Sequence, residues 1–230
     1  PAGDRRKFFD RQVLAHFPSH ARESAAYEKA MRERNVLLES DRPDPVWMDA
    51  VEARLSEAGA AIAVNRARVL VRMQQAINDR PEGHFPKADL KLAGEAEEMA
   101  EAGSDLAAIE DLISGAMREG RRRDMTAGRT LFGPHRSDLV VFHRPKSLQA
   151  AQCSTGEQKA LLIGLVLANA KALLEGDFAP NPLLLLDEAA AHLDSERRAA
   201  LYDELTNLGG QAWLTGTDSN LFDAFGDRAQ

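Results

Sequence analysis

The sequence is poor in several features that mark particular classes of protein. Its 230 residues contain a single cysteine, Cys153, so no internal disulfide can form, which suits a reducing compartment. No uncharged run of about 18 apolar residues occurs, so no membrane span is expected. The N-terminus also lacks the basic-then-apolar pattern of a signal peptide. Together these absences predict a cytoplasmic protein.

The dipeptide Gly-Lys is also absent from the chain. Phosphate-binding loops of P-loop ATPases contain it, followed by Ser or Thr, because the lysine reaches the nucleotide phosphates. The 230 residues therefore contain no such loop. If the protein has one, we expect it to precede residue 1, so that the chain would begin inside a domain and end shortly before that domain's last strand.

Two carboxylates follow a run of four leucines, 183–186, which predicts a short and fully buried strand. Asp187 and Glu188 stand at its C-terminal end, where α/β sheets place their chemistry. This is the form of a Walker B strand, in which the first acidic residue holds Mg²⁺ and the second polarises the attacking water. The alternative is a helix whose first turn carries acidic residues because the helix dipole favours anions there.

A hydroxyl and a glycine precede the apolar run 160–168, which predicts a buried helix. Backbone N–H groups freed at a helix N-terminus bind anions. The segment resembles the signature loop of ABC-type ATPases, which contacts the γ-phosphate of a nucleotide held by the opposite subunit. The alternative is an ordinary helix cap. The residues of this segment are Ser154, Thr155, Gly156, Glu157 and Gln158.

A third motif, Gly133-Pro134-His135-Arg136 within residues 130–139, resembles a segment of the RecF family of recombination and replication-repair ATPases. Its order before the signature and the Walker B strand also matches that family. Residues 5–11 and 27–38 are similar to the family's entry into its helical arm, so the resemblance runs nearly from end to end. One departure is Ser137, which stands where many members have an acidic residue.

The resemblance implies a nucleoid-associated, ATP-dependent DNA-binding protein of recombinational repair, replication restart and the SOS response. Two heads would close over two ATP molecules with Mg²⁺, and hydrolysis would reverse both dimerisation and DNA binding. The family also implies gapped or junction DNA as the substrate and RecR and RecO as partners. Asp194 would belong to the D-loop, and Thr215 and Thr217 to the switch region.

Two other functions stay open. A transporter nucleotide-binding domain is weakened by the long helical segment and by Thr215-Gly216-Thr217-Asp218, because transporters carry a histidine in the switch. A catalytically inert module that binds DNA or a partner is the second alternative. Whether the chain belongs to an enzyme is therefore left open, and without the phosphate-binding loop these 230 residues should not hydrolyse ATP.

Basic residues gather between residues 118 and 146, where eight Lys and Arg outnumber three Asp and Glu for a local charge of +5 in a chain of net charge −7. Such a stripe can steer a polyanion onto one face. The alternative is a solvated face in which arginines bond the last carbonyls of a helix. The candidate DNA-binding residues are Arg121, Arg122, Arg123 and Arg136.

The architecture predicted from these patterns is α/β, with a P-loop NTPase fold. Residues 1–125 would form a mostly α-helical arm, and residues 126–230 the C-terminal part of an ABC-type ATPase head. A helix over residues 45–78, begun by Asp44 and interrupted on its apolar stripe by Arg66, suits an antiparallel coiled coil or one member of a compact bundle.

Further elements follow from periodicity and turn residues. A helix over residues 105–122 should bury Leu106, Ile109, Leu112, Ile113 and Met117. Strands are expected at 140–142, 183–186 and 211–214, helices at 161–174 and 195–205, and an insertion-like loop at 175–182.

Overall fold

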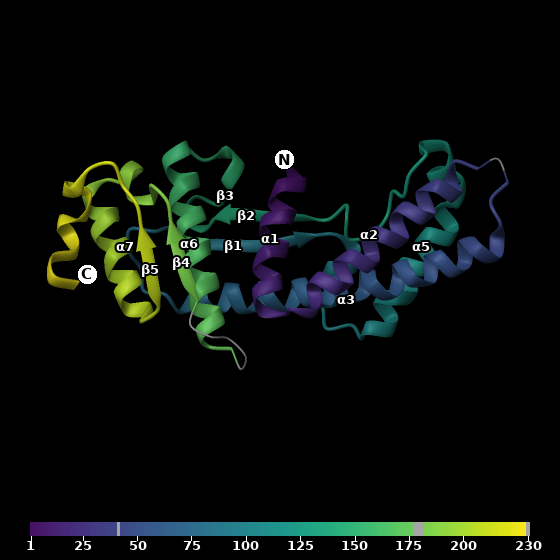
Figure 1. Cartoon of the computed structure of the whole chain (residues 1–230), viewed down its shortest axis with the longest axis horizontal. Coiled ribbons are helices and arrows are strands. Elements are labelled where there is room, and N and C mark those ends of the chain that lie inside the picture. The colour runs from purple at the N-terminus through teal and green to yellow at the C-terminus, as the bar shows by residue number, and fades with distance from the viewer. Residues whose placement is uncertain (41, 177–181, 229–230) are drawn as a thin grey trace. The chain divides into compact units, whose positions relative to one another are not determined.

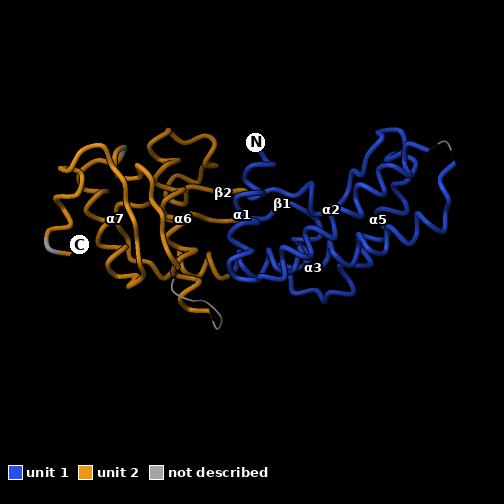
Figure 2. Tube along the Cα trace, in the orientation of Figure 1, with its two compact units in different colours: residues 1–71, 91–139 blue, residues 72–90, 140–230 orange. Residues whose placement is uncertain are grey.

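The computed structural model describes residues 1–40, 42–176 and 182–228 (Figure 1). Most of the expected loop at 175–182 therefore lies outside the described residues. Contacts divide the chain into two compact units (Figure 2): unit 1 comprises residues 1–71 and 91–139, and unit 2 comprises residues 72–90 and 140–230. The sequence predicted a boundary between arm and head at residues 125 and 126. The two units are defined by contacts and do not test that boundary, which stays a prediction.

Helices dominate unit 1. Asp44 starts the longest, α3, by accepting the N–H of Val46 on its carboxylate at 2.9 Å, and Asp105 caps α5 by accepting the N–H of Ala108. Both helices start where the sequence places them. None of the described helices is long and apolar enough to cross a membrane. The helices are α1 (Ala2–His16), α2 (Ser19–Leu38), α3 (Pro45–Asp79, which continues into unit 2), α4 (Glu95–Glu101) and α5 (Leu106–Ala127).

One core joins α2, α3 and α5 in unit 1, and side chains such as Leu55, Ile113 and Met117 are fully buried in it. A core shared by three helices is compatible with the bundle interpretation of α3, and the choice between a bundle and a coiled-coil arm stays a prediction. The prediction for Leu106 was wrong, because 49% of its surface is exposed. The core along α5 begins only at Ile109, one turn further into the helix.

A three-stranded sheet has the order β1-β2-β3, built from β1 (Ala88–Ala93), β2 (Asp138–His143) and β3 (Leu148–Gln149). The last two strands pair antiparallel, with Phe142 opposite Gln149. The sequence predicted an almost wholly helical first half, and β1 corrects that. Its partner β2 comes more than 40 residues later, so the pairing that makes residues 88–93 a strand has no local signal.

Unit 2 contains a second sheet of two parallel strands, β4 (Leu183–Leu186) and β5 (Gln211–Leu214), in the register Leu183 opposite Gln211. Helices α6 (Thr155–Leu174) and α7 (Ser195–Leu208) pack with this sheet in one core, which contains the fully buried Leu201 and Tyr202. Both strands have the bounds that the sequence predicted. Short 3-10 helices lie at η1 (Arg144–Lys146), η2 (Ala150–Gln152), η3 (Ala189–His192) and η4 (Ser219–Arg228).

The four leucines of β4 are not all buried, which corrects the prediction of a fully buried strand. Leu183 and Leu185 are 54% and 72% exposed, whereas Leu184 and Leu186 pack against the core. On the neighbouring strand Trp213 is 61% exposed. Successive side chains of a strand point to opposite faces, so a continuous apolar run does not reveal whether this chain covers one face or both.

Candidate functional site

The parallel pairing of β4 and β5 brings their C-terminal ends to the same edge of unit 2. Thr215, which follows β5, donates its hydroxyl hydrogen to the carboxylate of Asp187 and accepts the backbone N–H of Glu188 at 3.0 Å. Its own N–H donates to the carbonyl of Leu186 at 3.1 Å. One threonine therefore connects both acidic residues that follow β4.

Glu188 has a backbone φ of +47°, in the left-handed region that non-glycine residues seldom adopt. It precedes η3, yet its side chain makes no capping hydrogen bond to that helix. Glu188 nevertheless occupies the N-cap position of η3, so the helix-dipole alternative stays open. Asp187 and Glu188 are exposed at the sheet edge, and a strained residue in such a place is a reason to propose a function.

A pocket of about 320 Å³ lies between α6 and β4 and includes both carboxylates. Lys159, the residue directly after the signature segment, lines it from α6 beside the apolar Leu162 and Val166. Sequence reasoning missed this lysine, although its place in the first turns of the signature helix was a signal that could have found it. The pocket thus combines a cation and two carboxylates.

The carboxylates at the end of β4 could hold Mg²⁺ only together with ligands from another molecule. Within the described residues no group of three or more His, Cys, Asp or Glu side chains could hold a metal ion. Mg²⁺, however, usually keeps several waters and is bound by one or two carboxylates together with substrate phosphates. Asp187, with the Thr215 hydroxyl beside it, is compatible with Mg²⁺ bound to a nucleotide.

The signature segment begins α6 with a complete capping box. Ser154 accepts the N–H of Glu157 on its hydroxyl oxygen at 3.4 Å, and the Glu157 carboxylate accepts the N–H of Ser154 at 3.0 Å. The ammonium group of Lys146 also donates to this carboxylate. Lys146 and then Ser154 lower the pKa of Glu157 to about 2. Ser154 is thus a helix cap, which does not exclude a contact with a nucleotide.

The other residues of the signature segment differ in whether their side chains are bonded to the protein. Gln158 donates its side-chain amide to the carbonyl of Cys153 at 2.9 Å and so supports the loop, whereas Thr155 is exposed. A Cβ atom at Gly156 would meet no atom within 4 Å. Packing therefore gives no reason for glycine at residue 156, whereas close approach by another molecule would.

Two further predicted site residues also lie in unit 2. Asp194 is the N-cap of α7 and accepts the N–H of Arg197 at 2.8 Å; this bond is the main cause that lowers the pKa of Asp194. Thr217 lies exposed just beyond Thr215. Neither contact tests a role toward nucleotide, so the D-loop and switch assignments stay predictions.

The candidate DNA-binding arginines are not equivalent. Arg121 donates to the carboxylates of Glu52 and Asp49, so its charge is already neutralised. Arg144 pairs with Asp89 in the same way. These pairs, and the one between Lys146 and Glu157, leave fewer free cations than the local charge of +5 indicates. Arg122, Arg123 and Arg136 are exposed.

The chain is similar along its whole length to known proteins. It is 54% identical over 233 residues to the DNA replication and repair protein RecF of Caulobacter sp. (strain K31), covering 99% of this chain and 59% of that protein. It is 49% identical over 232 residues to the RecF of Rhizobium meliloti (strain 1021), covering 100% of this chain and 61% of that protein. The chain thus spans about three fifths of the length of these relatives. No protein-family model matches it.

The fold is similar to that of solved structures. A structure of the recombination mediator protein RecF-ATPrS in the RecFOR pathway superposes with a TM-score of 0.79 at 21% identity, over 96% of this chain and 59% of that chain. A structure described as RecF-ATP gives 0.77 at 20% identity. These likenesses confirm the predicted α/β fold, which the chain shares with the two RecF structures.

Proposed function

Because the chain belongs to the RecF family of DNA replication and repair proteins, we propose that it serves ATP-dependent DNA binding in recombinational repair and replication restart. The observation that carries the proposal is the Thr215 hydroxyl joined to both acidic residues at the strand edge. Two copies of the head would close over two ATP molecules. Each nucleotide would lie against Asp187 and Glu188 of one subunit and the signature segment of the other.

Each residue has a distinct role in this proposal. Asp187 would hold Mg²⁺, which when bound neutralises charge on the phosphates. Glu188 would orient and polarise the attacking water, while Thr215 keeps the Asp187 carboxylate in place. The space above Gly156 would let a phosphate approach the free N–H groups at the start of α6. Thr217 and Asp194 would contact the closed interface.

Partners follow from the family alone. We propose gapped or junction DNA as the substrate, the nucleoid as the site of action, and RecR and RecO as the proteins that cooperate with this one. Because the fold resembles that of a protein described as a recombination mediator in the RecFOR pathway, this set of partners is preferred to the membrane subunits of a transporter.

The catalytic assignment is tested in a chimera in which this chain replaces the matching segment of the Caulobacter relative. Glu188→Gln should retain ATP binding and stabilise the closed dimer while it abolishes turnover, because the amide cannot polarise water. Asp187→Asn should weaken Mg-ATP binding itself. Normal turnover by the Glu188→Gln chimera would refute the assignment.

The signature is tested by separating its two roles at Ser154. Ser154→Asp keeps a good N-cap but places a negative charge where the partner's γ-phosphate would lie. The Ser154 hydroxyl also donates to the Glu157 carboxylate at 2.9 Å, so we expect some loss of thermal stability. Nucleotide affinity of the monomer should be unchanged, and ATP-dependent dimerisation should be lost in sedimentation. If Ser154 is a cap only, ATP will still induce the dimer.

A catalytically inert binding module stays the second candidate, on the observation that the 230 residues contain no Gly-Lys dipeptide. The purified chain should show no Mg²⁺-dependent ATP hydrolysis. Hydrolysis above the level of the Glu188→Gln variant would overturn the argument from the missing phosphate-binding loop. Absence of any ATP effect on the chimera would instead favour the inert module.

A further inference from the structure

The motif Gly133-Pro134-His135-Arg136 forms a turn in unit 1 that is held unusually firmly. Gly133 has a φ of +127°, and a Cβ there would lie 2.3 Å from the hydroxyl oxygen of Tyr27. The Tyr27 hydroxyl is 2.8 Å from Nδ1 of His135, whose Nε2 is 3.1 Å from the carbonyl oxygen of Thr130. A carbonyl only accepts, so Nε2 donates and Nδ1 accepts the tyrosine proton. Burial lowers the pKa of His135, which favours this neutral form of the ring.

Arg66 of α3 forms hydrogen bonds to the same turn. It is only 4% exposed, and its guanidinium donates to the carbonyl of Pro134 and to the hydroxyl of Ser137, both at 2.8 Å. The same nitrogen, Nη1, also lies 2.7 Å from the Glu97 carboxylate, and Nε and Nη2 donate to Asp10. The arginine that interrupts the apolar stripe of α3 is therefore the central support of the motif.

Helix α1 contributes the remaining contacts. Arg5 pairs with Asp138 through two hydrogen bonds of 2.9 and 2.6 Å. The half-buried Arg6 donates to the carbonyl of Ser137 at 2.8 Å. The turn is thus fixed by Tyr27, Arg66 and α1, and the side chain that it leaves exposed is Arg136. Among the described residues, no side chain or carbonyl forms a hydrogen bond or ion pair with the Arg136 guanidinium.

The charge around this turn is not balanced. The carboxylates of Asp138, Asp10 and Glu97 are already paired with Arg5 and Arg66. Burial, together with the nearby charges of Arg66 and Arg136, lowers the pKa of Arg6. A half-buried guanidinium bonded to a carbonyl and close to other cations is stabilised by an added anion.

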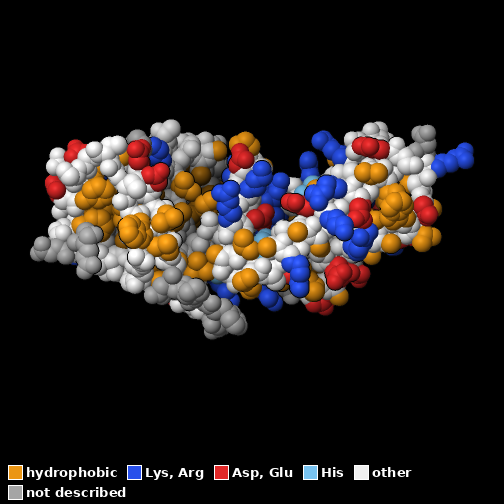
Figure 3. All heavy atoms as spheres, viewed as in Figure 1, with side chains coloured by type: hydrophobic (Ala, Val, Ile, Leu, Met, Phe, Trp, Pro, Cys, Tyr) orange, Lys and Arg blue, Asp and Glu red, His pale blue; other side chains and the backbone are white. Residues whose placement is uncertain are grey.

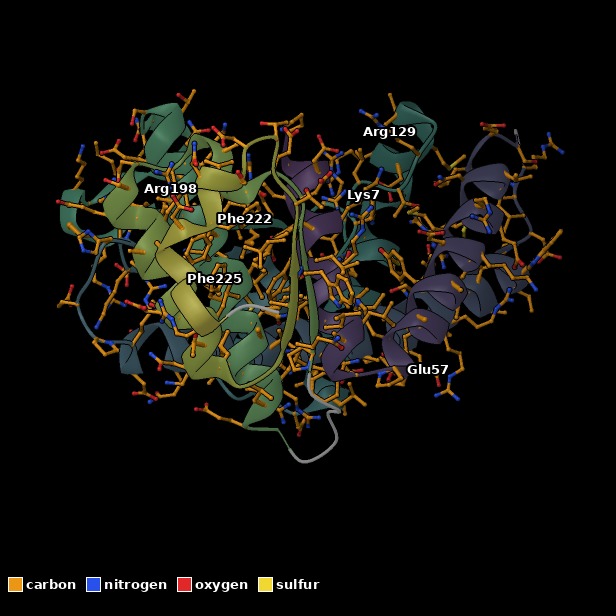
Figure 4. The ribbon with its side chains drawn as sticks, turned by 60° about the vertical axis from the view of Figure 1, so that its left-hand side comes forward. Lys7, Glu57, Arg129, Arg198, Phe222 and Phe225 are labelled. Atoms are coloured by element: carbon orange, nitrogen blue, oxygen red, sulfur yellow. The ribbon has the colours of Figure 1, made fainter. Side chains whose placement is uncertain are left out.

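The surface next to the turn is open and basic. Figure 3 shows Lys and Arg side chains gathered over α1 and around the hollow beside it in unit 1. Lys7 on α1 and Arg129 just after α5 lie on the same side in Figure 4. Both are exposed. Arg136 also lines a pocket of about 320 Å³ with three glutamates of α4. Glu97 is paired with Arg66 and Glu98 with Lys91, so Glu95 is the carboxylate of this pocket for which no cation partner is seen among the described residues.

We propose that Arg136 and Arg6, bordered by Lys7 and Arg129, form a phosphate-binding surface for the sugar-phosphate backbone of DNA. The proposal rests on the DNA-binding part of the proposed function and moves the contact from Arg121, which is neutralised, to the turn at 133–137. The role of the Gly133–Arg136 motif is then to hold one arginine in a fixed position beside α1. Backbone contacts of this kind are independent of base sequence and sensitive to salt.

The test measures binding of the purified 230-residue chain to two duplexes of unrelated sequence between 50 and 200 mM salt. Each lost phosphate contact lowers the slope of log affinity against log salt by about 0.9 on duplex DNA. We expect Arg136→Gln to lower the slope by about 0.9, and Arg6→Gln with Arg136→Gln by about 1.8, equally for both sequences. Glu95→Gln should increase affinity, because it removes the opposing charge.

Arg42→Gln is the matched control. Arg42 is exposed and lies in the turn between α2 and α3, which Figure 1 places at the other end of unit 1 from the N-terminus. The change of net charge is the same, so a general charge effect would lower both slopes alike. The Arg136 side chain forms no hydrogen bond or ion pair with the described part of the chain, so Arg136→Gln carries the test even if Arg6→Gln impairs folding.

The outcomes separate this inference from the proposed function. A slope for Arg136→Gln equal to that of wild type or of Arg42→Gln would overturn the inference, as would the absence of binding by wild type at 50 mM salt. ATP-induced dimerisation of the chimera is a separate measurement. DNA binding through Arg136 without an ATP-induced dimer would support the phosphate-binding surface and contradict the proposed function. An ATP-induced dimer with no effect of Arg136→Gln on DNA binding would support the proposed function and contradict the surface.

Discussion

Charged side chains are used differently in the two units. In unit 1 Arg34 and Arg66 are almost wholly buried, and each pairs with carboxylates from two other helices. In unit 2 Asp187, Glu188 and Asp194 are exposed, and their contacts are local or involve a single threonine. Buried charges are costly unless they are paired, so those of unit 1 hold helices together. The exposed carboxylates of unit 2 contribute little to folding and are free to meet another molecule.

The largest loss of stability is expected when the buried Arg34 of unit 1 is removed. Its guanidinium donates to Glu52 at 3.0 Å, to Asp124 at 2.6 Å and to Thr130 at 3.0 Å, and none of its surface is exposed. Arg34→Met would leave the buried Asp124 carboxylate without a cation and Glu52 with Arg121 alone, which costs about 3–5 kcal/mol. Urea unfolding measures the loss. The exposed pair of Arg228 with Asp203 in unit 2 is the control, and Arg228→Gln should cost less than about 1 kcal/mol. Similar losses for both would remove the distinction.

A second prediction compares one glycine from each unit. Gly133→Ala in unit 1 forces a side chain into the left-handed region and against Tyr27, so we expect a loss of about 2–3 kcal/mol. Gly156→Ala in unit 2 meets open space and should change stability by less than about 0.5 kcal/mol. Adding Tyr27→Phe to Gly133→Ala should restore part of the stability, because it removes the clashing hydroxyl. No restoration would mean that backbone strain alone decides the loss.

The third prediction concerns acid. Burial would raise the pKa of Asp10, but hydrogen bonds from His20 and Arg66 outweigh it and lower this pKa to about 2. A carboxyl with a depressed pKa contributes stability above its ordinary pKa of about 4 and loses it as the pH falls toward 2, here about 2 kcal/mol. Unfolding of wild type and Asp10→Asn between pH 5 and 2.5 measures the difference.

Asp194 in unit 2 should respond to acid and salt differently from Asp10. Its pKa is also lowered, but its side chain is 58% exposed, so its contribution should be screened by salt. In 1 M salt the acid-dependent loss due to Asp10 should persist, whereas any loss due to Asp194 should fade. A loss at Asp10 that salt abolishes would show that its pairing with Arg66 behaves as a surface contact.

The sequence predicted best the elements whose signals are local. The starts of α3 and α5 follow from Asp44 and Asp105, each of which caps its helix through a side-chain oxygen. The bounds of β4 and β5 follow from short apolar runs between turn residues. The cap at Ser154 is equally local, because both halves of its capping box lie within four residues.

What the sequence could not predict depends on distant partners. β1 needs β2, which lies far along the chain, and the exposure of Leu183 and Leu185 depends on what covers the outer face of β4. Arg66 breaks the apolar pattern of α3, and its partners Asp10 and Glu97 come from α1 and α4. The link from Thr215 to Asp187 requires the parallel pairing of two strands.

By itself the sequence determined the family, the order of its motifs, the limits of β4 and β5 and the starts of α3 and α5, because these depend on neighbouring residues and on spacing. The tertiary structure decided which charges are available. In the sequence Arg121 and Arg136 are equally basic, yet folding places Arg121 against Glu52 and Asp49 and leaves Arg136 exposed without such a partner on the described chain. Charge in a sequence is additive, whereas free charge on a surface depends on which carboxylates the fold brings within reach.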